Sequence, residues 1–141
     1  MSVEENKKIA QKFYDAIAAK QYDEVEKLCH KDFVYYPQVD IVLFGAKSFV
    51  DLERLNMDPF GDFKMEVEFM IGESDRVAVY LIVEGDLQTD KYHGMVVTNK
   101  HLRMGFMTWL QFKDGKIIEK HVKYDRFYIY KQLDIKELSL Q

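Results

Sequence analysis

The stretch FKDGKIIEKHVKYD, residues 112–125, decides the fold of this chain. Asp114 and Gly115 lie between two apolar segments in this stretch. Asp-Gly between alternating hydrophobic residues is a strong signal for a β-hairpin, because glycine tolerates the positive φ that the turn needs. The second segment ends in a single carboxylate, Asp125. If that end of the strand meets a pocket, Asp125 is the natural candidate for acid–base chemistry.

The segments around this hairpin follow an order typical of an α+β fold. Apolar residues at helical spacing predict helices over residues 3–20, 22–30 and about 47–56. Alternating or continuous apolar runs predict strands over residues 32–37, 65–71, 77–83, 101–112 and 116–130, with a polar connection over 88–100. Residues 132–140 form a short C-terminal segment that can be helical. We therefore expect one domain spanning residues 1–141.

Composition narrows the classes of partner. The chain has 141 residues, 48% of them hydrophobic, and a net charge of −4, so it can bury a core and lacks the basic face that nucleic-acid binding needs. No apolar run approaches the length of a membrane span, and the first residues show no signal peptide. The single cysteine, Cys29, rules out an intrachain disulfide and fits a reducing compartment. We expect a soluble cytoplasmic protein with no nucleic-acid or membrane partner.

The long strand before the hairpin is apolar on both faces. Met107 and Trp109 point to one side of the sheet, and Phe106, Thr108 and Leu110 point to the other. A sheet that helices cover on one side should show polar residues on its outer face. A second subunit is the simplest cover, so we predict a homodimer through the sheet. Burial by the chain's own helices and C-terminal segment is the alternative.

Several motifs together resemble the SnoaL-like polyketide cyclase group of the NTF2-like superfamily. They are FYDA at residues 13–16, Gly45, SDRVAV at 74–79, DGKIIE at 114–119, Asp125, and Gln132 with Leu133. The resemblance covers essentially the whole chain. It implies a cone, in which a strongly curved antiparallel sheet is closed by three N-terminal helices around a pocket.

The resemblance also implies a chemistry for Asp125. In the cyclases, an aspartate at the matching position is the general acid–base for an aldol ring closure, with no metal or organic cofactor. Desolvation in an apolar pocket would let such a carboxylate take and return a proton. This predicts a cofactor-independent cyclase, isomerase or hydratase that acts on a small apolar carbonyl compound. The structural alternative is a salt bridge from Asp125 to Arg126 or Lys123.

Aromatic residues supply the other candidate site positions. His121 shares a strand face with Asp125 but cannot touch it, because four residues of a strand span about 13 Å. We therefore expect His121 to line the pocket wall or to be an exposed strand residue. Trp109 and Met107 can form either the pocket wall or the dimer interface.

Three tyrosines complete the predicted substrate-binding set. The resemblance places Tyr35 and Tyr36 at the pocket mouth, with Tyr14 close by. A phenol can donate a hydrogen bond to a developing oxyanion. Closing one end of the cone is the alternative role for these rings.

A second hypothesis is a non-catalytic ligand-binding or structural dimer. Thr108 lies near the position where cyclases often carry a histidine. Tyr36 and Phe13 stand where ketosteroid isomerases carry a base and a tyrosine donor. His93 and His101 form no metal-ligand spacing, so we predict no metal site.

Overall fold

The computed structural model describes residues 1–135, so the segment predicted over 132–140 lies largely outside the described residues. The helices are α1 (Val3–Ala18), α2 (Tyr22–Leu28), α3 (Ala46–Met57) and α4 (Arg126–Gln132). The strands are β1 (Cys29–Gln38), β2 (Ile41–Phe44), β3 (Phe60–Glu73), β4 (Arg76–Leu87), β5 (Lys91–Tyr92), β6 (Met95–Val96), β7 (His101–Lys113) and β8 (Lys116–Lys123). The order of long elements confirms the predicted α+β class.

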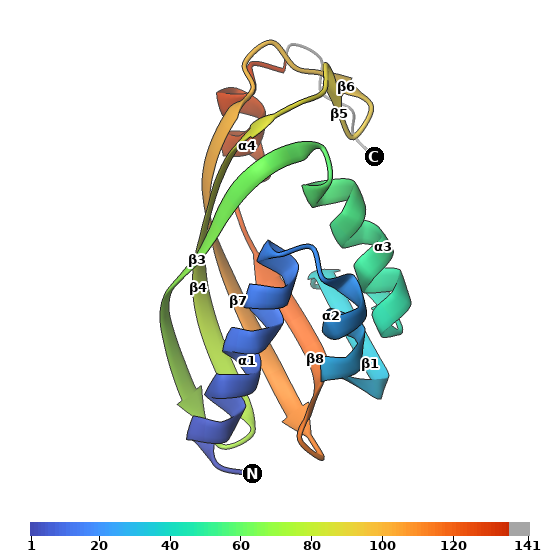
Figure 1. The fold of residues 1–141 in the computed structure, drawn as a ribbon, viewed down its shortest axis with the longest axis vertical. Helices are drawn as coiled ribbons and strands as arrows, with labels where there is room; N and C mark the ends of the chain where they lie inside the picture. Colours follow the sequence, from blue (N-terminus) through green and yellow to red (C-terminus); the bar gives the residue numbers. More distant parts are fainter. Residues whose placement is uncertain (136–141) are drawn as a thin grey trace.

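One six-stranded sheet, in the order β2-β1-β8-β7-β4-β3, forms the body of the molecule. It curves around helices α1, α2 and α3, which lie on its concave side (Figure 1). The expectation of a wholly antiparallel sheet is wrong, because β1 and β8 run parallel. These two strands are far apart in the chain, so no hairpin turn forces them to be antiparallel. The expectation of three N-terminal helices is also wrong, because only α1 and α2 precede the sheet, whereas α3 follows its strands β1 and β2.

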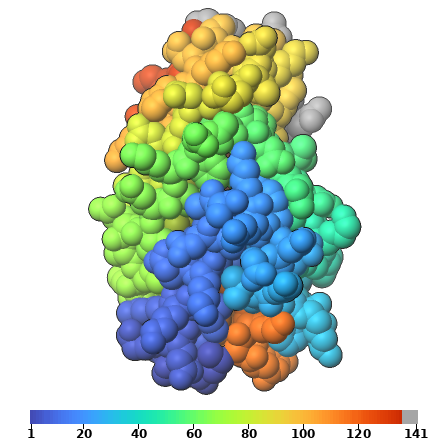
Figure 2. All heavy atoms as spheres, viewed as in Figure 1, coloured from blue at the N-terminus to red at the C-terminus, as the bar shows by residue number. Residues whose placement is uncertain are grey.

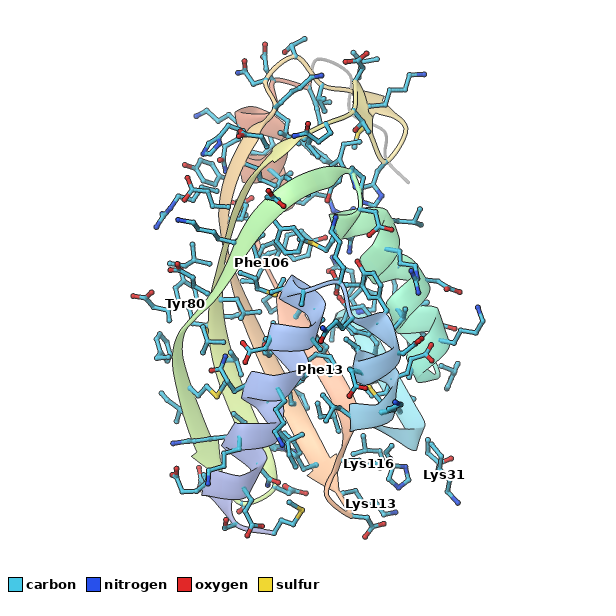
Figure 3. All side chains as sticks on the ribbon, viewed as in Figure 1. Phe13, Lys31, Tyr80, Phe106, Lys113 and Lys116 are labelled. Atoms are coloured by element: carbon cyan, nitrogen blue, oxygen red, sulfur yellow. The ribbon has the colours of Figure 1, made fainter. Side chains whose placement is uncertain are left out.

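The helices pack on the sheet through aromatic side chains. Helix α1 begins with a capping box between Ser2 and Glu5, which satisfies free amides of its first turn. Phe13 of α1 stacks on Phe49 of α3 with their centroids 5.7 Å apart, and Phe33 of β1 approaches Phe49 at 5.8 Å. Figure 3 shows Phe13 between the helices and the sheet. In Figure 2, the atoms of α1 and α2, drawn in blue, form the surface over this part of the molecule. This aromatic cluster closes one end of the concave side.

The Asp-Gly hairpin forms as predicted. Asp114 and Gly115 have φ angles of 52° and 75°, which is the geometry of a two-residue turn that matches strand twist. The pairing then becomes irregular. Phe112 pairs with Ile117, but Gln111 pairs with Glu119, so Ile118 has no partner on β7. Ile118 is therefore the extra residue of a β-bulge.

The bulge sets the direction of every later side chain on β8. Lys120 and Val122 are buried and point to the concave side, as does Leu110, which pairs with Lys120. Glu119 and His121 point to the convex side. Because side chains alternate along a strand, one extra residue exchanges the two faces.

Strand β8 ends earlier than predicted. It was expected to reach Tyr130, but it stops at Lys123, and α4 begins at Arg126. Asp125 is the N-cap of α4, so the chain leaves the sheet at this residue. The predicted polar connection 88–100 also contains the short hairpin β5–β6, which lies at the same end of the molecule as α4 (Figure 1). Among the described residues, no helix is long and apolar enough to cross a membrane.

Candidate functional site

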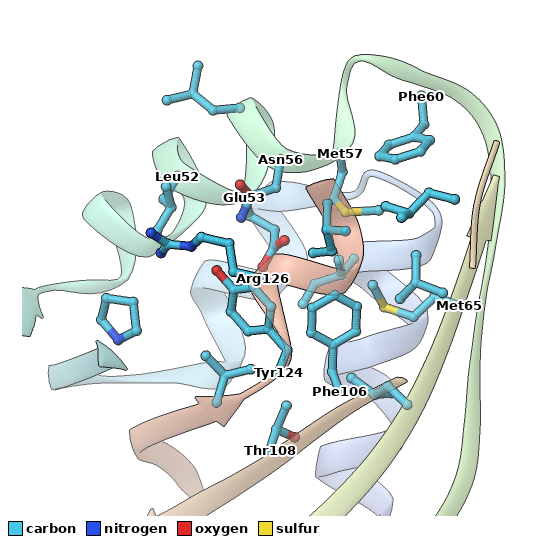
Figure 4. A pocket seen from close by; sticks show the side chains of 18 of the residues that line it. Leu52, Glu53, Asn56, Met57, Phe60, Met65, Phe106, Thr108, Tyr124 and Arg126 are labelled. Carbon is cyan, nitrogen blue, oxygen red and sulfur yellow. The ribbon is translucent and has the colours of Figure 1, made fainter. Parts of the chain in front are cut away.

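A cavity of about 550 Å³ lies between the concave face of the sheet and the helices. Its lining comes from α1, α3, α4, the inner faces of β1, β3, β4, β7 and β8, and the β5–β6 hairpin. Apolar side chains dominate the lining, as in Leu52, Met57, Phe60, Met65 and Phe106 (Figure 4). The volume and the character of the walls suit a small organic molecule.

Asp125 does not line this cavity. It is exposed, and its carboxylate accepts a hydrogen bond of 3.1 Å from the backbone N–H of Tyr128 as the cap of α4. Its neighbours Tyr124 and Arg126 both reach the cavity. The expectation that Asp125 faces the pocket is therefore wrong, because the bulge and the start of α4 direct it outward.

His121 lies on the convex face of the sheet. Its ring is stacked between Trp109 and Tyr36, with centroid distances of 3.9 and 4.5 Å, and its Nε2 lies 2.9 Å from a carboxylate oxygen of Glu119. Met107 is on the same face and 41% exposed. His121, Trp109, Tyr36 and Met107 are thus outside the cavity lining. The pocket-mouth position expected for Tyr36 is wrong, and of the two alternatives for His121, Trp109 and Met107 the pocket wall is excluded. The physical cause is again the alternation of faces along β7 and β8.

Tyr14 and Tyr35 do line the cavity; that they bind substrate stays a prediction. The hydroxyl of Tyr14 lies 2.6 Å from that of Thr108, and both side chains are buried. Desolvation raises the pKa of Tyr14, Tyr35 and Tyr92, and the negative charge of Glu53 raises all three pKa values further. These phenols therefore keep their protons at neutral pH and can act as hydrogen-bond donors.

Glu53 is the carboxylate that enters the cavity. It extends from α3 into the space that Tyr124, Arg126 and Phe106 also border (Figure 4). Desolvation raises its pKa, while the charge of Lys120 and a hydrogen bond with Asn56 partly oppose the shift. Glu53 is only partly buried as a residue, and it lines the cavity.

Glu53 was missed at the sequence level, although a signal was present. Phe49, Val50, Glu53 and Met57 recur at helical spacing, and the three apolar members of this set are buried. A charged residue on the apolar face of a helix is a candidate functional group, because burying it has a cost.

Lys120 also lines the cavity and was likewise missed at the sequence level. It is 4% exposed, and its Nζ lies 4.8 Å from the ring centroid of Tyr35 and 5.4 Å from that of Phe49. Desolvation lowers its pKa to about 8, which outweighs the opposing effects of Glu53 and Cys29. No sequence pattern shows that Lys120 points inward, because the bulge at Ile118 decides it.

The two histidines of unassigned role lie in different surroundings. His93 lines the cavity, and its pKa is lowered mainly by desolvation and to a smaller extent by the positive charge of Arg126. His101 is exposed and lies 2.8 Å from Asp86 and 2.9 Å from Glu84. Within residues 1–135, no group of three or more His, Cys, Asp or Glu side chains is placed to hold a metal ion.

Solved structures share this architecture. The chain resembles AclR from Streptomyces galilaeus, with 23% identity, a TM-score of 0.83 and coverage of 94% of this chain and 98% of that one. It resembles TsrD from Streptomyces laurentii, with 13% identity, a TM-score of 0.81 and coverage of 94% and 97%. An LEH-like epoxide hydrolase of M. tuberculosis has 15% identity, a TM-score of 0.71 and coverage of 93% and 90%. These identities support a common fold and no particular reaction.

The sequence itself gives a more specific result. No curated protein sequence matches the chain. The model of the SnoaL-like polyketide cyclase family, however, matches residues 8–133, which include both the helices around the cavity and the hairpin that carries Lys120. The chain therefore belongs to the SnoaL-like polyketide cyclase family, with the NTF2-like fold.

Proposed function

We propose that this protein is a cofactor-independent acid–base enzyme that acts on a small apolar carbonyl compound. Glu53, rather than Asp125, is the group that removes and returns the proton. The supporting observation is a carboxylate with a raised pKa that enters an apolar cavity of about 550 Å³. A carboxylate whose pKa approaches the working pH can serve as both base and acid.

The surroundings of Glu53 suit enolate chemistry. When Glu53 takes a proton from the carbon next to a carbonyl group, negative charge develops on the carbonyl oxygen. Protonated phenols such as Tyr14 and Tyr35 can donate hydrogen bonds to that oxygen. Aldol ring closure and double-bond isomerisation begin with such a step, and a hydratase ends with its reverse, so the proposal does not choose among them.

The test is enzyme-catalysed exchange of carbon-bound hydrogen. The apolar ketone 2-tetralone is incubated with the protein in D₂O, and loss of its α-hydrogen signals is followed by proton NMR. We expect wild type to exceed the buffer rate, and Glu53→Gln to lose roughly 10²- to 10⁴-fold of that acceleration. Asp125→Asn is the matched control, since it neutralises an exposed carboxylate, and it should keep the wild-type rate.

Two results would contradict the proposal. Equal exchange by wild type and Glu53→Gln would show that Glu53 does not transfer the proton. Loss of exchange in Asp125→Asn alone would return the role to Asp125. Saturable binding of 2-tetralone without exchange by any variant would instead support the non-catalytic ligand-binding alternative.

We also propose that two copies associate through the convex face of the sheet. Phe69, Ile71 and Met107 are 44%, 64% and 41% exposed on this face, close to the stacked rings of His121 and Trp109. Figure 3 shows Tyr80 on the same outer side of the sheet. Sedimentation equilibrium should give a dimer for wild type and a monomer for Met107→Glu, with Lys12→Glu, an exposed position on α1 away from the convex face, as the control that stays dimeric. A wild-type monomer at micromolar concentration would refute the dimer.

A further inference from the structure

The surroundings of Lys120 differ from those of a lysine that only stabilises the fold. Its position on β8 is opposite Leu110, in the buried layer of the sheet. Among the described residues, no hydrogen-bond acceptor or carboxylate lies within bonding distance of its Nζ. This atom instead lies 4.8 Å from the ring centroid of Tyr35 and 5.4 Å from that of Phe49. The side chain nevertheless lines the cavity, so a bound molecule can reach the amine.

We propose that Lys120 is an amine nucleophile that forms an imine with the carbonyl group of an aldehyde or ketone bound in the cavity. This inference rests on the proposed carbonyl substrate and narrows it to compounds with a free aldehyde or ketone. A lysine desolvated in an apolar pocket is a recognised way to obtain a reactive amine.

The covalent step balances without an oxidant or a reductant. The neutral amine adds to the carbonyl carbon, so a C–N bond forms and the C=O π bond breaks, and a proton then moves from the nitrogen to the oxygen to give a neutral carbinolamine. The hydroxyl group then leaves as water with a second proton, and the nitrogen lone pair completes the C=N bond. Glu53, which also lines the cavity, can supply that proton in its protonated form. Addition of water reverses the sequence and restores the amine.

The cavity favours the neutral amine that this step requires. Burial lowers the pKa of Lys120 to about 8, although Glu53 on α3 and Cys29 on β1 act in the opposite direction. At pH 7 its neutral fraction is roughly two hundred times that of an exposed lysine of ordinary pKa.

Reductive trapping tests the proposal. Wild type is incubated at pH 7 with 2-naphthaldehyde and sodium cyanoborohydride, which reduces an imine to a stable amine, and the adduct is located by peptide mass spectrometry. We expect Lys120 to be labelled at least tenfold faster than any other lysine. Lys120→Met should lose the fast adduct, and Lys123→Gln, an exposed neighbour on the same strand, should keep it.

The possible results separate this inference from the proposed function. Labelling spread evenly over surface lysines, or unchanged fast labelling in Lys120→Met, would overturn it. If Lys120→Met does not fold, the wild-type peptide map still decides. If Glu53→Gln still labels Lys120 fast and still exchanges hydrogen at the wild-type rate, the role of Glu53 is refuted and that of Lys120 stands. If exchange depends on Glu53 but no adduct forms at Lys120, the role of Lys120 is refuted and that of Glu53 stands.

Discussion

Glu53 and Asp125 are two carboxylates near one cavity, and they meet opposite environments. Asp125 follows a residue that lines the cavity and precedes another, yet it is exposed and caps α4. Glu53 lies in the middle of α3 and enters the cavity, where desolvation raises its pKa. Whether a residue reaches the cavity therefore depends on the direction of its side chain more than on whether its neighbours in the sequence line the cavity.

The comparison also separates what each carboxylate does for the fold. Asp125 makes a hydrogen bond that begins a helix, so it should contribute to stability. Glu53 and Lys120 are charged groups in an apolar space and form no salt bridge with each other within 4.0 Å, so their presence should reduce stability. Residues retained at such a cost are expected where function requires them.

Replacing Glu53 and Lys120 together should give the largest change in the free energy of unfolding. We expect Glu53→Leu/Lys120→Leu to raise the free energy of unfolding by about 1 to 4 kcal/mol, because two desolvated charges are replaced by apolar groups. Urea denaturation at pH 7 measures the change. Lys120→Leu alone, which leaves Glu53 without the nearby positive charge, should be less stable than the double variant. A double variant less stable than wild type would show that the two charges support the fold.

The next largest effect should be on the pH dependence of the unfolding free energy, and it should come from Lys120. Its pKa is about 8 in the folded state and lies near 10.5 when unfolded, so between these values the unfolded chain binds more protons. Stability contributed by this group therefore rises with pH across that window. We expect the difference in unfolding free energy between wild type and Lys120→Met to change in favour of wild type by on the order of 2 kcal/mol from pH 8 to 10. A difference that does not vary with pH would mean that Lys120 is solvated.

The hydroxyl pair beside the cavity should have a smaller effect. Thr108→Val removes the partner of the buried Tyr14 hydroxyl, 2.6 Å away, and leaves that group unsatisfied. We expect a loss of about 1 to 2 kcal/mol in unfolding free energy. Thr108→Ser keeps the hydroxyl and should recover most of it, and Thr108→Val/Tyr14→Phe should lose less than the two single changes combined. Additive losses would indicate that the pair does not interact.

The cap at Asp125 should give the smallest effect. Asp125→Ala removes the acceptor for the N–H of Tyr128 and should cost about 1 kcal/mol in unfolding free energy. Asp125→Asn should stay close to wild type, because asparagine is an equally good cap. Chemical denaturation of the three proteins provides the test. A large loss in Asp125→Asn would show that the charge, rather than the hydrogen bond, matters.

Local signals in the sequence predicted much of the fold. The Asp114-Gly115 turn and the alternation along β7 formed as expected, because turn φ angles and strand period depend on a few neighbouring residues. The site was predicted less well. Tyr14 and Tyr35 reach the cavity, whereas Asp125 and His121 do not.

By itself, then, the sequence determined the hairpin and the family, since both follow from short motifs and local conformation. The tertiary structure alone decided which face of β8 meets the cavity. The bulge at Ile118 depends on how β8 pairs with both β7 and β1, strands whose registers no local motif encodes. Because side chains alternate with a period of two, that single unpaired residue turns Lys120 inward and His121 outward.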